Sequence, residues 1–428
     1  MSPGFLNGVV APGIHTATLG LLELWQLKSR LAGSRSFDAD ADIIRAVVDV
    51  VLLVSYGFDV GTIRTQMEEI SSRAADVVGS TPDDDTPVEF PSAEDPTAYG
   101  AMRNLVDSIQ IGMSSPFPRQ HLTFALNYYP SLVSARKFVD NLLTERLKAT
   151  YKKFSDDGNY EQTIGSAMDV IVSAEVAKAK EDGHQPMYDT PAIRDELVGF
   201  FTAGHETTST TLRWCVKQLT RHQTVQHRLR KALRLAHHRA AEAGTLPSPD
   251  YIAKTTVPYL DAFIEENHRV AAAIPTVIRM ATRDTVVLGH KIPKGTDVFM
   301  PVNGPSYVSP SFPINEYERS LSSQAAKDRY GEWDHKDMAE FKPERFLVTS
   351  GDGTGSFNPK AGPILPYGAG LRGCFGVKMA KLELRVIITM ILWTFKLLPL
   401  PPEVSNFGGE DVNTHRPQQT YLRLERVT

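Results

Sequence analysis

The stretch Tyr367-Gly368-Ala369-Gly370-Leu371-Arg372-Gly373-Cys374-Phe375-Gly376 lies near the C-terminal end of the chain and holds one of its two cysteines. Its glycines permit positive φ and close backbone approach, so peptide N–H groups can converge on the Cys374 sulfur while a flat ligand lies against the loop. The helix expected after the loop and Arg372 both favour the thiolate, the form of cysteine that binds metals. A lone cysteine is more often a small buried apolar residue, but this glycine pattern predicts a metal-bound thiolate at Cys374.

Three further motifs precede this loop, and the four together resemble the sequence pattern of the cytochrome P-450 family. They are Ala203-Gly204-His205-Glu206-Thr207-Thr208, Glu266-Asn267-His268-Arg269 and Phe341-Lys342-Pro343-Glu344-Arg345-Phe346. They are similar, in the family's order, to its oxygen-activating helix, its E-x-x-R helix and its P-E-R-F segment. Tyr367 stands where the family usually carries Phe. The resemblance covers the chain from about residue 20 to the end and is to eukaryotic, fungal-type members.

This resemblance implies a cytochrome P-450 fold, mostly α with small β-sheets, and a haem b cofactor. Cys374 would be the axial ligand of the haem iron, a thiolate that pushes electron density onto the metal. Arg372 and the less regular match Arg279 would face the haem propionates, because planar guanidinium groups suit carboxylates. The residues that would line the cofactor are Tyr367, Gly368, Ala203 and Gly204.

The residues around Glu206 support a proton relay on a long helix. Ala203 and Gly204 remove side-chain bulk at one turn, and the hydroxyl residues 207–211 can compete for the preceding carbonyls and open the helix locally. An acid beside an alcohol, Glu206 next to Thr207, can pass protons through water to oxygen that is being activated. A Thr-rich stretch of packed helix is the alternative interpretation. His205 is interpreted as a helix-side residue and not as a metal ligand.

Glu266 and Arg269 are three residues apart, so a helix places them on one face. Such a pair is usually exposed and contributes little to stability. The resemblance implies instead that Glu266, Arg269 and Arg345 form a buried charged triad behind the cysteine loop, with a structural role.

Composition excludes some classes of protein. With 428 residues, 42% of them hydrophobic, and a net charge of -4, the chain reads as a globular protein and gives no electrostatic case for binding nucleic acid. Cys215 lies in a helical pattern beside Trp214 and is expected to pack in the core. No apolar run approaching the roughly 18 residues of a membrane span is identified, so no anchor is expected.

The chain is expected to form a single domain, residues 1–428. An acidic, proline-rich segment, residues 80–96, is predicted to be a solvated surface loop. Asp189-Thr190-Pro191 predicts the start of a helix that runs to about Leu219 and crosses the core. Strands are expected at residues 286–288, 297–302 and 421–427. The resemblance implies that the anchor and sheet-rich N-terminal portion of a eukaryotic member precede the start of this sequence, near Pro3 to Leu6.

The expected function is that of a haem-thiolate monooxygenase acting on a hydrophobic small molecule, for which the resemblance suggests a specialised (secondary) metabolite. Dioxygen would be the co-substrate, and electrons would come from NADPH through cytochrome P-450 reductase. A form with an anchor would lie at the cytosolic face of the endoplasmic reticulum membrane; a cytoplasmic location and contact with a membrane surface are both compatible with the chain as given. Two alternatives stay open: an enzyme of the same fold that rearranges peroxides, and a haem-poor, truncated relic without activity.

Overall fold

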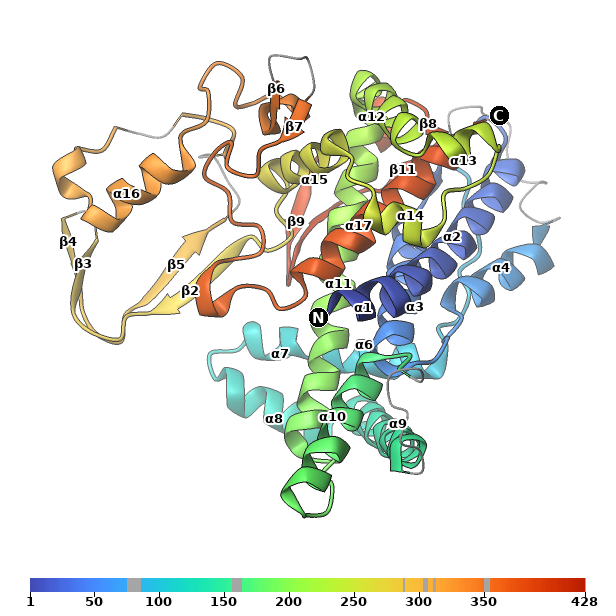
Figure 1. Ribbon diagram of the computed structural model, residues 1–428, viewed down its shortest axis with the longest axis vertical. Helices are drawn as coiled ribbons and strands as arrows, with labels where there is room; N and C mark the ends of the chain where they lie inside the picture. The colour runs from blue at the N-terminus through green and yellow to red at the C-terminus, as the bar shows by residue number, and fades with distance from the viewer. Residues whose placement is uncertain are drawn as a thin grey trace.

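The computed structural model describes residues 1–74, 86–155, 164–287, 289–302, 307–310, 313–349 and 355–427. Helices dominate and the strands are short, which confirms the predicted mostly α class with small sheets. Figure 1 shows the helices gathered into one body, from which β2 to β5 and α16 project to one side.

The helices follow one another through most of the chain. Their bounds are α1 (Pro3–Phe5), the π-helical η1 (Leu6–Val10), α2 (Ala11–Ala32), α3 (Asp40–Tyr56), α4 (Thr62–Ser72), α6 (Thr97–Asp107), α7 (Ile109–Met113), α8 (Pro118–Tyr128), α9 (Pro130–Ser155), α10 (Ala167–Asp182), α11 (Pro191–Arg221), α12 (Gln223–Ala236), α13 (His238–Glu242), α14 (Pro249–Lys254), α15 (Pro258–Val270), α16 (Leu321–Tyr330) and α17 (Val377–Thr394). Short 3-10 turns lie at η3 (Glu316–Glu318), η4 (Pro343–Phe346), η5 (Gly370–Arg372) and η6 (Pro402–Val404).

Helix α11 is the central element of the fold. The Thr190 hydroxyl caps its first turn by accepting from the Ile193 N–H at 3.3 Å, and Pro191 occupies the first helical position, as the sequence predicts. Its C-terminal half, residues 208–220, is buried all round. It packs against α3, α15, α17 and the C-terminal strands, so both sides of the molecule are built on it (Figure 1).

Helix α3 is buried because it lies between α2 and α11. Its valine-rich run would favour a strand by intrinsic propensity, but burial on opposite faces suits a helix that is apolar all round. Two acids tie it to its neighbours. Asp42 accepts from Lys28 of α2 at 2.6 Å, and Asp49 accepts from the Thr62 N–H at 2.9 Å, at the start of α4.

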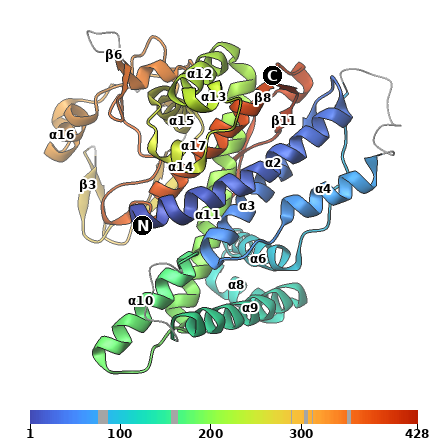
Figure 2. The ribbon, with the colours of Figure 1, turned by 45° about the vertical axis from the view of Figure 1, so that its right-hand side comes forward.

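The strands pair in two-stranded antiparallel sheets. The pairs are β1 (Phe37–Asp38) with β11 (Tyr421–Leu422), β9 (Gly409–Asp411) with β10 (His415–Pro417), β8 (Phe395–Leu397) with β12 (Leu424–Arg426), β2 (Thr276–Met280) with β5 (Asp297–Pro301), β3 (Thr285–Val287) with β4 (His290–Ile292), and β6 (Leu347–Thr349) with β7 (Gly355–Phe357). Each of the three ranges expected to form strands does so: 286–288 corresponds to β3, 297–302 to β5, and 421–427 to β11 and β12. Leu288 is outside the described residues. Figure 2 shows α9 and α10 together at the end of the molecule opposite β8.

The acidic segment 80–96 differs from the predicted solvated loop where it is described. Residues 80–85 lie outside the described residues. Beyond them, Val88 is buried and its N–H donates to the Ser36 carbonyl at 2.7 Å. Arg45 of α3 donates to the Ala93 carbonyl at 3.2 Å and pairs with Asp95 at 3.5 Å. Glu89 and Glu94 are exposed, whereas Val88 and Ala93 are buried and Asp95 faces Arg45, so the described part of the segment is a loop that lies partly against the body.

The expectation that no stretch is long and apolar enough to span a membrane is wrong, because one helical stretch meets both criteria. Residues Pro3–Ala32 form a helical stretch of 30 residues that is apolar enough to cross a bilayer, and 39% of its most apolar window is buried in the structure. Glycines, prolines and threonines interrupt its apolar residues, so the sequence contains no continuous apolar run here. Leu24 and Trp25 of this stretch are fully buried and belong to the core.

Candidate active site

The cysteine loop turns sharply at two glycines before it reaches Cys374. Gly368 and Gly370 adopt positive φ values of 66° and 63°, a region that residues with a Cβ rarely occupy. The Cys374 N–H donates to the Tyr367 carbonyl at 2.8 Å and closes the loop. Helix α17 begins at Val377, and Cys374 itself is exposed. The loop therefore presents the cysteine at its surface and does not pack it in the core.

Two neighbouring cavities open between α11 and the start of α17. Their volumes are about 710 and 570 Å³, within the range of pockets that hold small molecules and cofactors. Both are lined by Cys374, Thr207, Thr208 and Ala380, so they meet at the cysteine.

Two arginines line the smaller cavity, as the resemblance implies. Arg279 on β2 and Arg372 in the cysteine loop share this wall with Tyr367 and Gly368. Arg279 donates to the neighbouring Ile278 carbonyl at 2.8 Å. Neither arginine forms an ion pair with a carboxylate among the described residues. Two uncompensated guanidinium groups on one wall suit a ligand that carries carboxylates.

The larger cavity holds a residue that the sequence analysis did not single out, Glu383 of α17. Its side chain lines the cavity, only 1% of the residue is exposed, and its Oε1 has no hydrogen-bond partner among the described residues. Burial raises the pKa of Glu383 to about 8, which keeps much of this carboxyl neutral at pH 7. The signal in the sequence was the one acid in the mainly apolar run from Leu382 to Trp393, which also contains Arg385 and Thr389.

Helix α11 brings Ala203, Gly204 and Thr207 to the larger cavity. The absence of a side chain at Gly204 allows α3 to pack closely against α11, because a Cβ there would lie 3.1 Å from Cγ2 of Val51 on α3. The Thr207 hydroxyl donates to the Ala203 carbonyl at 2.7 Å, and Thr211 donates to the Thr207 carbonyl at 2.9 Å. The hydroxyl groups thus bond preceding carbonyls as expected, but α11 stays a continuous helix and does not open.

Glu206 is not among the described residues that line the two cavities, whereas its sequence neighbour Thr207 lines both. The Oε1 atom of Glu206 accepts from the Thr414 hydroxyl at 2.8 Å. It also lies 3.8 Å from Arg213 and 3.9 Å from Arg416. Adjacent residues on a helix point about 100° apart, so Glu206 can contact Arg213 of α11 and Arg416 of β10 while Thr207 lines the cavities.

Glu266, Arg269 and Arg345 lie together, as the resemblance implies. Glu266 and Arg269 on α15 are fully buried and form two bonds, Nε to Oε2 at 2.7 Å and an Nη to Oε1 at 2.8 Å. Arg345 of η4 donates to Glu266 at 3.1 Å and to Asp337 at 2.8 Å.

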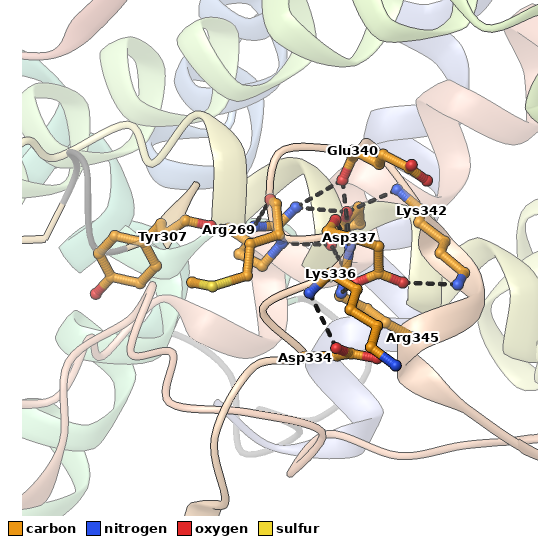
Figure 3. A network of polar contacts seen from close by, with 10 residues as sticks. Arg269, Tyr307, Asp334, Lys336, Asp337, Glu340, Lys342 and Arg345 are labelled. Carbon is orange, nitrogen blue, oxygen red and sulfur yellow. Dashed lines mark hydrogen bonds and ion pairs between the residues drawn. The ribbon is translucent and has the colours of Figure 1, made fainter. Parts of the chain in front are cut away.

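Backbone carbonyls complete the surroundings of Arg269. It donates to the Met338 and Glu340 carbonyls, both at 2.9 Å, and to the Tyr307 carbonyl. Figure 3 shows Arg269 and Arg345 converging on the turn around Asp337. The network therefore joins α15 to the segment that leads into the cysteine loop.

Tyr367 uses the hydroxyl that distinguishes it from Phe. Its OH lies 3.0 Å from His268 Nε2, and the two rings meet edge to face. His268 belongs to α15, directly before Arg269, and is buried. Burial lowers the pKa of His268, so a neutral ring bonds the first residue of the cysteine loop to this helix.

The other cysteine and the histidine of α11 have no part in the cavities. Cys215 is fully buried, and burial raises the pKa of its thiol. His205 stacks on Phe201 and its Nδ1 lies 2.8 Å from the Phe201 carbonyl. Among the described residues, no three His, Cys, Asp or Glu side chains gather as a metal site.

The chemistry of these walls fits a haem. Cys374 lies where the two cavities meet and would offer a sulfur ligand, the two arginines would offer partners for propionates, and apolar side chains such as Val51, Phe200 and Met379 line much of the rest. This donor set matches the axial thiolate of a haem-thiolate protein.

The comparisons with known proteins agree with this geometry. The sequence model of the family described as cytochrome P-450 matches residues 11–308 and 331–420. A cytochrome P-450 monooxygenase of Pestalotiopsis microspora is 42% identical over 99% of this chain and 74% of its own length. One of Fusarium sporotrichioides is 33% identical over 100% of this chain and 76% of its own length. A crystal structure of a cytochrome P-450 haem domain superposes with a TM-score of 0.65 at 19% identity, covering 100% of this chain and 76% of that one.

Proposed function

The chain belongs to the cytochrome P-450 family and is a cytochrome P-450 monooxygenase, and from this premise we propose that it inserts one oxygen atom of dioxygen into a hydrophobic small organic molecule. The observation that carries the proposal is the Cys374 loop facing Thr207 across two cavities that also hold Arg279 and Arg372.

Cys374 would bind the haem iron, and Arg279 and Arg372 would hold the propionates. The haem, when bound, supplies the dioxygen chemistry. The protein contributes the sulfur ligand, the charge partners and the apolar walls. The Tyr367 bond to His268 and the Glu266–Arg269–Arg345 network would fix the loop that carries Cys374.

Thr207 would hold the proton donor at the reacting oxygen. Its hydroxyl lines both cavities and rests on the Ala203 carbonyl. The relay proposed from the sequence needs a second step, because Glu206 bonds Thr414 on the other side of α11. In this proposal the Glu206 carboxylate takes a proton from solvent water, turns toward Thr207 as the neutral acid and donates that proton to the Thr207 hydroxyl. The Thr207 hydroxyl gives up its own proton toward the cavity as it accepts the new one, and Glu206 is left as the carboxylate.

The overall reaction would convert a substrate C–H group, dioxygen, two electrons and two protons into an alcohol and water. NADPH would be the electron source and cytochrome P-450 reductase the carrier. The apolar walls of the larger cavity, with Phe200 and Met379, support a hydrophobic substrate. A role in specialised metabolism rests on the fungal origin of the two relatives and not on any residue of the cavity.

The experiment begins with the purified chain, reduced and exposed to carbon monoxide. A thiolate-type absorbance band is expected for the wild-type chain and for Cys215→Ser. Candidate hydrophobic substrates are then turned over with isotopically labelled dioxygen, and one labelled oxygen atom is expected in the product. Absence of the band would favour the haem-poor relic. A band together with label-free isomerisation of added peroxides would favour the peroxide-rearranging enzyme.

A further inference from the structure

A separate hollow of about 360 Å³ lies at the C-terminal end of α11, away from both cavities of the active site. The chain folds back there, so that the end of α11 meets the segment after β8 and strand β11. The lining residues are Lys217, Thr220, Arg221, Pro399, Leu400, Pro402, Ser405, Phe407 and Tyr421. This lining includes two cations and no carboxylate.

Lys217 is the unusual member of this lining, because it is buried without an acidic partner. Only 5% of the residue is exposed, and its ammonium makes one hydrogen bond, to the Gln419 carbonyl at 2.7 Å. No carboxylate pairs with it among the described residues. An ammonium carries three N–H donors, so two donors of Lys217 remain for hydrogen bonds to a ligand. Burial lowers the pKa of Lys217 to about 8, because loss of hydration disfavours the charged form.

Arg221 supplies a second uncompensated cation at the mouth of the hollow. Its guanidinium lies 4.7 Å from the centre of the Phe407 ring, and the Lys217 ammonium lies 5.1 Å from the same ring. Like charges so arranged repel each other and would gain from an anion between them.

The end of α11 does not account for these cations. Cations often neutralise the last carbonyls of a helix, but other donors already serve those carbonyls. The His222 N–H donates to Gln218 at 2.8 Å, and the Gln223 side chain donates to Thr220 at 2.8 Å. The Gln226 side chain donates to Leu219 at 2.9 Å. The charges of Lys217 and Arg221 therefore remain available to a ligand.

The rest of the lining limits the kind of ligand. Leu400, Pro399 and the Phe407 ring offer apolar contact, and the hydroxyl of Tyr421 offers a polar one. A bare inorganic ion would leave this apolar surface unused. Lys217 lies ten residues after Thr207, about 15 Å along the helix axis, so such a ligand does not compete with the substrate cavity.

We propose that this hollow is a second binding site, distinct from the active site, which takes a small organic anion: a carboxylate or phosphate group bonded by Lys217 and Arg221, on an apolar body that packs against Phe407.

The test uses the holoenzyme and isothermal titration calorimetry with phenyl phosphate, benzoate, inorganic phosphate and the neutral benzyl alcohol. Phenyl phosphate and benzoate are expected to bind one per chain and more tightly than inorganic phosphate, while benzyl alcohol does not bind here. The haem absorbance is recorded in the same titration and should stay unchanged, because binding in the substrate cavity would perturb it.

Two variants and one control assign the binding to the hollow. Lys217→Met keeps the apolar stem and is expected to weaken phenyl phosphate binding by about 10-fold to 100-fold, as for the loss of a hydrogen bond to a charged group. Arg221→Gln, at an exposed position, should weaken it by a few-fold. Arg234→Gln is the matched control, since Arg234 lies over the Trp393 ring at 5.3 Å, outside the hollow, and should leave binding unchanged.

Lys217→Met removes a buried charge, so the variant is expected to fold and keep its haem spectrum. Equal affinity of Lys217→Met and the wild-type chain would overturn the proposal. Equal binding of benzyl alcohol, or a haem shift that follows the titration, would do the same. Failure of the proposed monooxygenase reaction would leave these binding results unaffected.

Discussion

Replacing Arg269 with alanine tests the charged network behind the cysteine loop most directly. Arg269 is fully buried, and its guanidinium bonds both oxygens of Glu266 and the carbonyls of Met338, Glu340 and Tyr307. Arg269→Ala removes all of these donors at once. Glu266 keeps Arg345 and the Lys342 N–H at 2.7 Å, but it loses the partner that shares its helix.

The expected loss follows from these contacts. Removing one member of a buried ion pair typically costs about 3 to 5 kcal/mol, because the remaining charge stays in a low dielectric. Each carbonyl left without a donor adds to the cost by about 1 to 3 kcal/mol where water cannot enter. These costs are not additive, so we expect a loss of about 4 to 5 kcal/mol. That is a large part of the roughly 5 to 15 kcal/mol that stabilises a typical domain, and Arg269→Ala is therefore expected to yield apo or insoluble protein.

Denaturant unfolding followed by helical circular dichroism measures the loss, and the reduced carbon monoxide spectrum measures haem occupancy. Arg228→Ala is the matched control, because Arg228 and Glu344 also pair but their side chains are 58% and 31% exposed. Arg228→Ala should change the free energy of unfolding and the haem occupancy little. The reasoning would be refuted if Arg269→Ala were soluble, fully loaded with haem and as stable as Arg228→Ala.

Three further predictions concern the cavities. Cys374→Ser should abolish the thiolate-type spectrum, whereas Cys215→Ser should leave it intact; the opposite result would show that the ligand is misassigned. Thr207→Ala should keep haem but lower product formed per electron, since loss of a general acid typically costs about 100-fold to 10,000-fold in rate, and an unchanged yield would exclude the relay. Glu383 has a pKa raised from 4.5 to about 8 by burial, so the native state retains a proton that the unfolded state has lost between these values. The free energy of unfolding should therefore fall as pH rises from about 4.5 to about 8, by up to about 1.4 kcal/mol per pH unit. Glu383→Gln should remove this slope, and an identical pH profile for variant and wild type would show that the carboxyl is solvated.

Local sequence rules predicted the elements that depend on nearby residues. Thr190 and Pro191 start α11 where the capping pattern placed its beginning, because a helix start is decided within one turn. The glycines before Cys374 predicted a tight loop followed by a helix, and Gly368 and Gly370 adopt the positive φ that this loop requires. The pair Glu266 and Arg269 likewise follows from helical spacing.

Other features of the site depend on residues distant in sequence. The sequence predicts that the missing side chain at Gly204 leaves room for a cofactor. In the structure the side chain of Val51, about 150 residues earlier, packs against Gly204 instead. The sequence predicts that Glu206 acts with Thr207, but in the structure the Glu206 carboxylate contacts Thr414 and Arg416 of the C-terminal segment. Such outcomes depend on which charged groups the fold brings near, and helical spacing carries no information about them.

The sequence by itself determined the family, the tight glycine loop around Cys374 and the start of α11, because each follows from short motifs whose chemistry is local. Only the tertiary structure decided which side chains face the cavities, that Glu383 Oε1 is buried without a hydrogen-bond partner among the described residues, and that Lys217 and Arg221 share a hollow whose described lining holds no acid. Burial and electrostatic interaction act through space, so residues far apart in the chain set them together.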